Sequence, residues 1–98
     1  MKVAFKDPKL RRLVEEGKNA EKLPLGIYEA LLEVMVAIVS ARDERDLYRQ
    51  RSLNMERLHG DRRGQYSIRL NKQYRLCFEI HKDQDGNLIW ILEIVDYH

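Results

Sequence analysis

The sequence contains almost no cysteine. Cys77 is the only one in 98 residues, which excludes an intrachain disulfide and a zinc site built from the cysteines of one chain. A chain of this length without such cross-links relies on its hydrophobic core for stability. The composition, 44% hydrophobic and 35% charged, is typical of a water-soluble globular protein, and we expect one domain over residues 1–98.

Long apolar runs are also absent. The longest, Ala30–Val39, has ten residues and is interrupted by Glu33, whereas a membrane-spanning helix needs about 20. The basic start MKVAFKDPK has only Val3–Phe5 as its apolar stretch, and a signal-peptide core needs roughly 7 to 15 apolar residues. We therefore expect no membrane span and a cytoplasmic location.

The charges nearly balance over the whole chain but not within it. There are 18 Lys and Arg against 16 Asp and Glu, yet residues 41–75 hold ten basic and five acidic side chains, a net charge of +5 that leaves −3 for the rest. Nine of those ten cations are arginine, which binds phosphate in a bidentate way and stacks on bases. The segment is either a nucleic-acid-binding surface or a solvated charged face, and composition alone does not decide.

Two helices are predicted in the first half of the chain. Asp7 followed by Pro8 is typical of a helix start, and this first helix is expected to run to Gly17. A longer, amphipathic helix is predicted to open at Pro24. Its main apolar face consists of Ile27, Leu31, Val34, Met35 and Ile38, and Leu32, Val36 and Val39 are expected to widen the buried stripe.

Strands are predicted in the second half. Residues 43–54 are densely charged and favour one weak helical turn followed by a loop. Apolar and polar residues then alternate over 65–70, 74–80 and 88–95, with turns at 71–73 and at Asp85–Gly86. The order indicates an α+β fold in which the two N-terminal helices pack on one face of an antiparallel β-sheet and the other face is free.

The alternation also assigns side chains to the two faces of the sheet. Arg69 and Arg75 fall on the polar sides of neighbouring strands, so the free face is expected to carry guanidinium groups side by side. Trp90 alternates with Leu88, Leu92 and Ile94 and is therefore predicted in the core rather than as a stacking platform for a base.

Four stretches of sequence carry a resemblance to a known family. They are FKDPKLRRLVEEG at 5–17, LHGDRRGQYSIRL at 58–70, YRLCFE at 74–79 and IVDYH at 94–98. In this order and spacing they resemble the HigB branch of the RelE/ParE toxin superfamily over nearly the whole chain. The resemblance implies a RelE-like fold and a ribosome-dependent mRNA endonuclease that inhibits translation. It also implies binding to mRNA in the ribosomal A site, to the small ribosomal subunit and to a HigA-like helix-turn-helix antitoxin.

The chemistry of RNA cleavage can be set beside that resemblance. Attack by the neighbouring 2′-hydroxyl needs a base, cations for the phosphorane, and an acid for the departing 5′-oxygen. Histidine suits both proton transfers near neutral pH, and the chain has three: His59, His81 and His98. The resemblance implies functional roles for Asp96, Tyr97 and His98, with His98 transferring the proton. If the last strand continues, Asp96 and His98 point to one face and Tyr97 to the other.

The remaining candidate residues are basic or lie near basic residues. By the resemblance, Arg75 faces the scissile phosphate; the structural alternative is an ion pair with Glu79 or Glu93. Many relatives have lysine where this chain has His59, so His59 is either the second acid-base group, a phosphate contact or a surface side chain. The residues expected to grip the RNA backbone or the ribosome are Arg57, Arg62, Arg63, Arg69 and Lys72.

Other functions remain open. A metal-dependent nuclease would need convergent ligands, and the spacing of His59, Asp61, Asp96 and His98 does not support one, so no metal or cofactor is expected. A ParE-like inhibitor of DNA gyrase would share the fold, although the terminal Asp-Tyr-His and the LHGDRRGQYS run argue against it. A non-catalytic RNA-binding module needs only basic residues on an open sheet.

Overall fold

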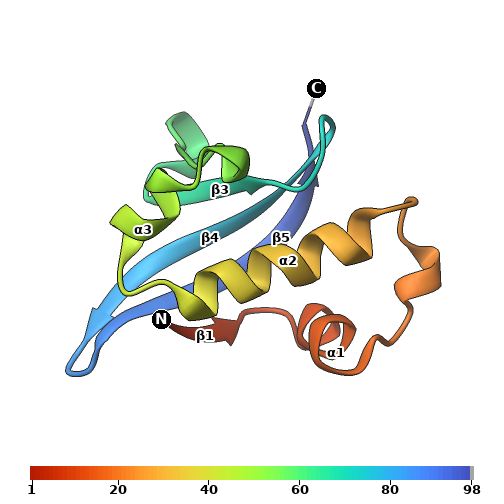
Figure 1. Cartoon of the computed structure of the whole chain (residues 1–98), viewed down its shortest axis with the longest axis horizontal. Coiled ribbons are helices and arrows are strands. Elements are labelled where there is room, and N and C mark those ends of the chain that lie inside the picture. The colour runs from red at the N-terminus through yellow and green to blue at the C-terminus, as the bar shows by residue number, and fades with distance from the viewer. Residues whose placement is uncertain (98) are drawn as a thin grey trace.

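The computed structural model of the chain describes residues 1–97 (Figure 1). Helices and strands alternate irregularly along the sequence, with the two longest strands at the end. The elements are β1 (Lys2–Phe5), α1 (Pro8–Glu16), the 3₁₀ turn η1 (Ala20–Lys22), α2 (Ile27–Ser40), α3 (Glu44–Arg49), η2 (Arg51–Leu53), β2 (Glu56–Arg57), η3 (Gly60–Arg62), β3 (Gln65–Arg69), β4 (Tyr74–Asp83) and β5 (Gly86–Asp96).

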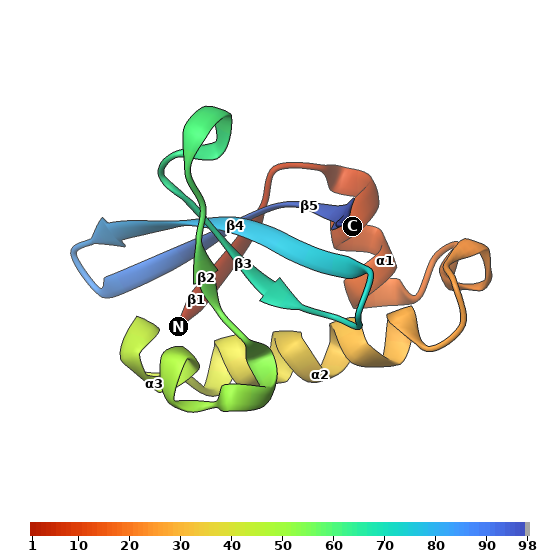
Figure 2. The same ribbon diagram turned by 90° about the horizontal axis from the view of Figure 1, so that it is seen from above.

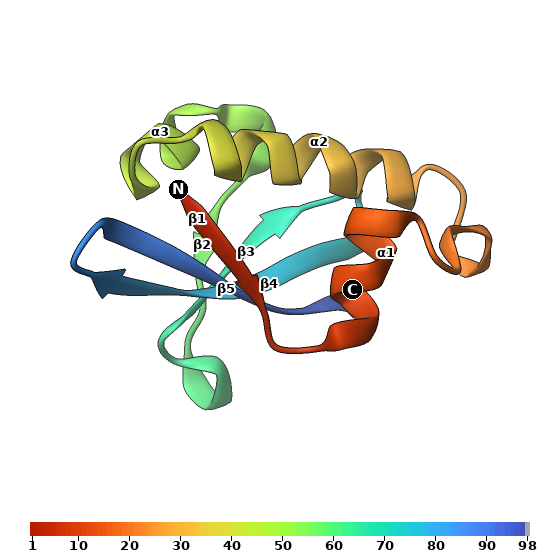
Figure 3. The ribbon, with the colours of Figure 1, turned by 90° about the horizontal axis from the view of Figure 1, so that it is seen from below.

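The strands form one five-stranded sheet in the order β1-β5-β4-β3-β2. Figures 2 and 3 show α2 and α3 on one side of this sheet and the connection that carries η3 projecting from the other side. The α+β class is confirmed, as are the hairpins β3–β4 and β4–β5. The sheet is larger than predicted: β2 was not foreseen, and β1 adds a strand parallel to β5.

Local sequence explains where the two long helices begin and end. Asp7 caps α1 by accepting a hydrogen bond from the backbone N–H of Lys9 at 2.8 Å, and Gly17 ends the helix in the left-handed conformation, with φ of 70°, as predicted. Helix α2 begins at Ile27 rather than at Pro24. Gly26 has φ of 83°, which no right-handed helix contains, so the helix starts only after it. No helix in the described residues 1–97 has the length and apolar character needed to cross a membrane.

The core lies between α2 and the sheet. Leu31 and Ile38 of α2 are fully buried there, together with Leu76 and Phe78 of β4. The prediction that Val36 and Val39 widen the buried stripe is wrong, because they are 66% and 59% exposed. A single helix on a sheet buries only the stripe that faces the strands, and nothing among the described residues covers the outer side of α2.

A β-bulge in β5 changes which side chains face the core. Cys77 pairs with Glu93 while Phe78 pairs with Ile91, so Leu92 is an extra residue in the strand. Before the bulge Ile89 and Ile91 are buried in the core, and beyond it Ile94 packs against the core. The core position predicted for Trp90 is therefore wrong: it lies between Ile89 and Ile91 and points to the opposite face.

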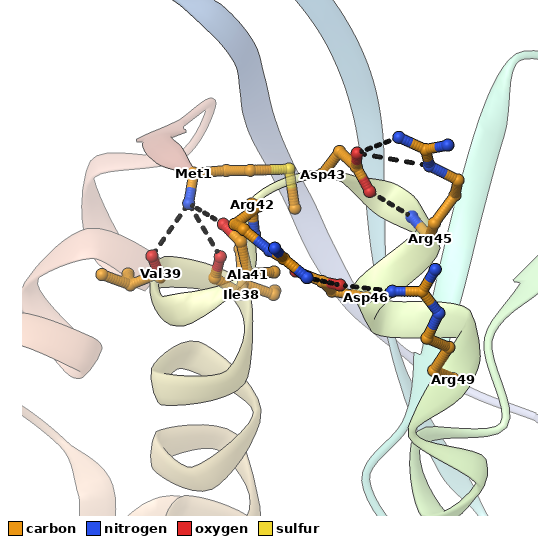
Figure 4. A network of polar contacts seen from close by, with 9 residues as sticks. All are labelled: Met1, Ile38, Val39, Ala41, Arg42, Asp43, Arg45, Asp46 and Arg49. Carbon is orange, nitrogen blue, oxygen red and sulfur yellow. Dashed lines mark hydrogen bonds and ion pairs between the residues drawn. The ribbon is translucent and has the colours of Figure 1, made fainter.

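A network of polar contacts ties the end of α2 to α3 (Figure 4). The amino group of Met1 donates hydrogen bonds to the carbonyl oxygens of Ile38, Val39 and Ala41 at 2.7–3.1 Å. Asp46 accepts from Arg42 and Arg49, and Asp43 accepts from Arg45. The backbone N–H and guanidinium of Arg42 lower the pKa of Asp46, and Arg45 lowers that of Asp43. Three arginines of the basic segment are therefore held in ion pairs on this side of the sheet.

Candidate functional site

The face of the sheet opposite α2 carries a compact polar cluster at the centre of β3, β4 and β5. Cys77 lies in register with Ser67 on one side and Glu93 on the other, and Arg75 is two residues away on the same strand. Because side chains at alternate positions share a face, all four point to the free side of the sheet. Ser67 and Cys77 have no exposed surface, and Arg75 is only 7% exposed.

Arg75 is held by a fixed set of acceptors. Its Nε donates to Ser67 Oγ at 2.7 Å, and its Nη2 donates to the carbonyl oxygens of Asn54 and, at 3.4 Å, Ser67. Nη2 also lies 3.9 Å from a carboxylate oxygen of Glu56. The ion pair with Glu79 or Glu93 considered from the sequence is not formed. Within residues 1–97 no hydrogen bond involves Nη1.

Arg62 reaches the same face from the η3 connection. Its Nη1 donates to Gln65 Oε1 at 2.8 Å, and its Nη2 donates to Glu93 Oε2 at 3.2 Å. The connection is thereby fastened over the sheet, since Gln65 belongs to β3 and Glu93 to β5. Arg62 and Arg75, both singled out from the sequence, therefore lie on either side of Cys77 on one face.

The thiol of Cys77 is enclosed by these charges. Burial raises its pKa; Arg62 and Arg75 oppose that shift, and Glu93 adds to it. A raised pKa keeps the sulfur in its protonated form at neutral pH, and the thiolate is the reactive form. Cys77 accordingly fills space between the charged residues, and burial disfavours its thiolate.

The C-terminal residues are divided between the two faces. Val95 lies opposite Arg75 and Asp96 lies opposite Tyr74, so Tyr97 is on the free face with Arg75, whereas Asp96 is on the other. The N–H of Tyr97 donates to the carbonyl of Gln73 at 2.6 Å, and Gln73 Nε2 donates to Asp96 Oδ2 at 3.1 Å. The hydrogen bond from Tyr97 continues the pairing of β5 with β4 by one residue, which supports the predicted opposite orientation of Asp96 and Tyr97. His98 lies outside the described residues.

The other predicted site residues are exposed, and one of them, Arg57, lies on the face of the sheet that carries the helices, because it pairs with Tyr66. His59 precedes η3, and Arg57, Arg63 and Lys72 also lie at the surface. Arg69 lies opposite Arg75 in the register and so on the same face, as expected. Its Nε donates to the carbonyl of Asn71 at 3.2 Å, and the residue lines a pocket with Glu33 of α2. The two arginines are directly opposite each other in the register, and like charges in that position repel.

Sequence reasoning missed Ser67, Asn54 and Gln65 as partners of the arginines, and it considered Glu93 for Arg75 rather than for Arg62. The alternation over 65–70 puts Ser67 on the face of Arg69, so the strand register alone could have identified it. The contact with the carbonyl of Asn54 could not be predicted in this way, because the path of the chain before β2 brings that carbonyl to Arg75. Among the described residues, no group of three or more His, Cys, Asp or Glu side chains could hold a metal ion.

Comparison with known proteins gives a consistent result over almost the whole chain. The family described as the RelE-like toxin of type II toxin-antitoxin system HigB matches residues 3–98. The toxin HigB-1 of Vibrio cholerae serotype O1 is 37% identical over 79 residues, which cover 81% of this chain and 83% of that protein.

Solved structures share the fold at lower identity. YafQ from Escherichia coli superimposes with a TM-score of 0.61 at 8% identity, covering 96% of this chain and 90% of that one. The YoeB-YefM complex from Staphylococcus aureus gives 0.60 at 20% identity, covering 100% and 97%. At these identities the likeness shows the fold alone.

Proposed function

This chain belongs to the HigB-like family of RelE-type toxins of type II toxin-antitoxin systems, and we propose that it is a ribosome-dependent endoribonuclease that cleaves mRNA and so inhibits translation. The observation that carries the proposal is the family match over residues 3–98. The free face of the sheet supports it, because two arginines there converge on a surface that the helices leave uncovered. The polar cluster around Cys77 would thus lie at the floor of the RNA site.

The proposed chemistry is cleavage by the 2′-hydroxyl next to the scissile phosphate. The 2′-oxygen attacks phosphorus as its proton passes to a base, and the bond to the 5′-oxygen breaks as that oxygen takes a proton from an acid, which leaves a cyclic phosphate and a 5′-hydroxyl. No metal takes part in this scheme. His98 transfers a proton, Asp96 orients or stabilises its imidazole, and Tyr97 stacks on a base or assists proton transfer. His59 is the candidate for the second acid-base group.

Arg75 is the proposed cation for the phosphorane. Its Nε and Nη2 are bound to Ser67 and Asn54, so the guanidinium is already oriented and needs little reorganisation when the charge develops. Nη1 is the edge that would meet the phosphate. The exposed residues Arg57, Arg63 and Lys72, together with Arg62 and Arg69, are proposed to bind the RNA backbone or the ribosome.

Dependence on the ribosome follows from how few acid-base groups the site offers. A site of this kind gains most of its rate from substrate that is held in the reactive geometry by something else, here mRNA in the A site of the small ribosomal subunit. The proposal includes a HigA-like helix-turn-helix antitoxin as partner and the cytoplasm as the place of action.

The test is a brief induction of the wild type and of His98→Ala in cells, with 5′ ends of messages mapped while translation runs and while it is blocked. New 5′ ends that need both translation and His98 are the expected result. Antitoxin binding by His98→Ala controls for folding. New ends with translation blocked would contradict ribosome dependence, and growth arrest without new ends would favour a gyrase inhibitor or an RNA-binding module.

A further inference from the structure

Trp90, the only tryptophan of the chain, lies on the free face of the sheet. It is half-buried, it pairs with Glu79 of β4 and Ala4 of β1, and its strand neighbours Ile89 and Ile91 are buried in the core on the other side. Nothing in the proposed cleavage chemistry uses this ring. A partly exposed indole on an open sheet offers an aromatic surface on which a base of any kind can stack.

A pocket of about 420 Å³ lies on the same face beside Trp90. Glu79 connects the two, because it lies opposite Trp90 in the register and also lines the pocket. Arg62 connects the pocket to the polar cluster, since its two acceptors, Gln65 and Glu93, both line the pocket. The other lining residues include Lys6, Asp7 and Leu92. The pocket is therefore continuous with the proposed RNA site.

The pocket offers a nucleotide one cation, Lys6, and the acceptors of Asp7, Glu79 and Glu93. Asp7 accepts from the N–H of Lys9, Glu79 lies 2.8 Å from the Nε2 of His81, and Glu93 accepts from Arg62, so each of its three carboxylates already has a donor. Lys6 forms no ion pair or side-chain hydrogen bond with any of residues 1–97. An ammonium without a partner remains for a phosphate, and carboxylate oxygens remain as acceptors for the amino group of a base.

We propose that Trp90 and this pocket form a second nucleotide subsite, specific for a base with an exocyclic amino group. The indole ring stacks on the base, Glu79 and Glu93 accept hydrogen bonds from its amino group, and Lys6 binds the phosphate. Uracil has no amino group and is disfavoured. The role of the subsite rests on the proposed function. A rise of about 3.3 Å per residue along β5 puts Trp90 roughly 23 Å from Tyr97, so the subsite would hold RNA several nucleotides from the cleaved bond.

Trp90 provides its own reporter, because no other tryptophan contributes to the fluorescence. The purified wild type is titrated with AMP, CMP and UMP. Stacking is expected to quench Trp90 fluorescence, with AMP and CMP binding about tenfold more tightly than UMP, the ratio that one hydrogen bond to a charged acceptor provides. Lys6→Ala is expected to weaken all three. Equal affinity for the three nucleotides, or no quenching at millimolar concentration, would overturn the subsite.

A second measurement joins the subsite to cleavage. In cells, Trp90→Leu is expected to cut the same messages with a flattened base preference at one position flanking the cut, and Trp90→Phe, which keeps an aromatic ring, to retain the wild-type preference. An unchanged preference in Trp90→Leu refutes the role. If the wild type produces no new 5′ ends at all, the proposed function fails, and the nucleotide titration still decides whether the subsite exists.

Discussion

Replacing Arg75 by alanine is predicted to destabilise the fold, because this side chain is a structural element as well as a candidate catalytic one. Arg75 is almost completely buried on the free face and bridges Ser67 of β3 and the carbonyl of Asn54 in the preceding loop. An alanine removes the donors and leaves both acceptors in place. Ser67 has no exposed surface, so its hydroxyl loses a buried partner.

The size of the effect follows from these contacts. A hydrogen bond from a charged donor contributes about 1.5–3 kcal/mol, and an acceptor left unsatisfied in the interior costs about 1–3 kcal/mol. Two such contacts are lost, and the variant no longer bears the desolvation cost of burying the guanidinium, so the expected loss in the free energy of unfolding is about 2–4 kcal/mol. A domain of this length has a free energy of unfolding of about 5–15 kcal/mol, so the loss is a large part of the total.

Urea unfolding followed by circular dichroism measures this loss of stability. With a denaturant slope of about 2 kcal/mol/M, the midpoint of Arg75→Ala is expected about 1–2 M below that of the wild type. Arg45→Ala is the matched control: Arg45 is exposed and pairs with Asp43 only at the surface, so its midpoint should barely move. The double variant Arg75→Ala/Ser67→Ala should lose less stability than the sum of the losses of the two single variants. A wild-type midpoint for Arg75→Ala, or strictly additive losses, would refute the bridging role.

Three further predictions follow from burial and ion pairing, the first two measured by urea unfolding and the third by a thiol reagent. Leu31→Asp should abolish cooperative unfolding, because Leu31 is fully buried and an unpaired charge there is very costly, whereas Val36→Asp on the exposed side of α2 should change stability by less than about 0.5 kcal/mol. The pKa of Asp46 is lowered in the fold by Arg42. The carboxylate of Asp46 therefore stabilises the fold above its unfolded pKa of about 3.9, and this stabilisation is lost as the pH falls through the folded pKa. In Asp46→Asn, the urea midpoint should therefore fall less steeply as the pH is lowered. Cys77, whose pKa burial raises, should react with a thiol reagent at pH 8 far more slowly in the native protein than in urea, and equal rates would contradict its burial.

The parts of the fold that could be predicted from the sequence are those that local chemistry determines. Asp7, Pro8 and Gly17 lie within one short segment and define both ends of α1. Strand β1 was missed because four residues give little periodicity and its partner, β5, lies at the other end of the chain. Strand β2 consists of Glu56 and Arg57, two charged residues whose pairing depends entirely on β3.

The candidate site was predictable in its residues but not in its contacts. The family resemblance singled out Arg62 and Arg75, and both lie on the free face. Which acceptors they use depends on strand register and on the paths of the connections before β2 and through η3. Arg69 and Arg75 show the same limit: the sequence puts them on adjacent strands, and only the register shows that they are directly opposite and therefore repel.

The bulge at Leu92 explains why Trp90 was predicted on the wrong face of the sheet. It also explains why the C-terminal residues are divided between the two faces. In a strand without it, the alternation that buries Ile89 and Ile91 would also bury Glu93, an uncompensated charge that costs several kcal/mol, and would expose Ile94. One extra residue places Glu93 on the free face, where it binds Arg62, and returns Ile94 to the core. The same shift brings Tyr97 to the face of Arg75 and leaves Asp96 on the other. The order of charged and apolar residues in β5 therefore requires the bulge, and the bulge places Asp96 on the helix-bearing face of the sheet, opposite Tyr74.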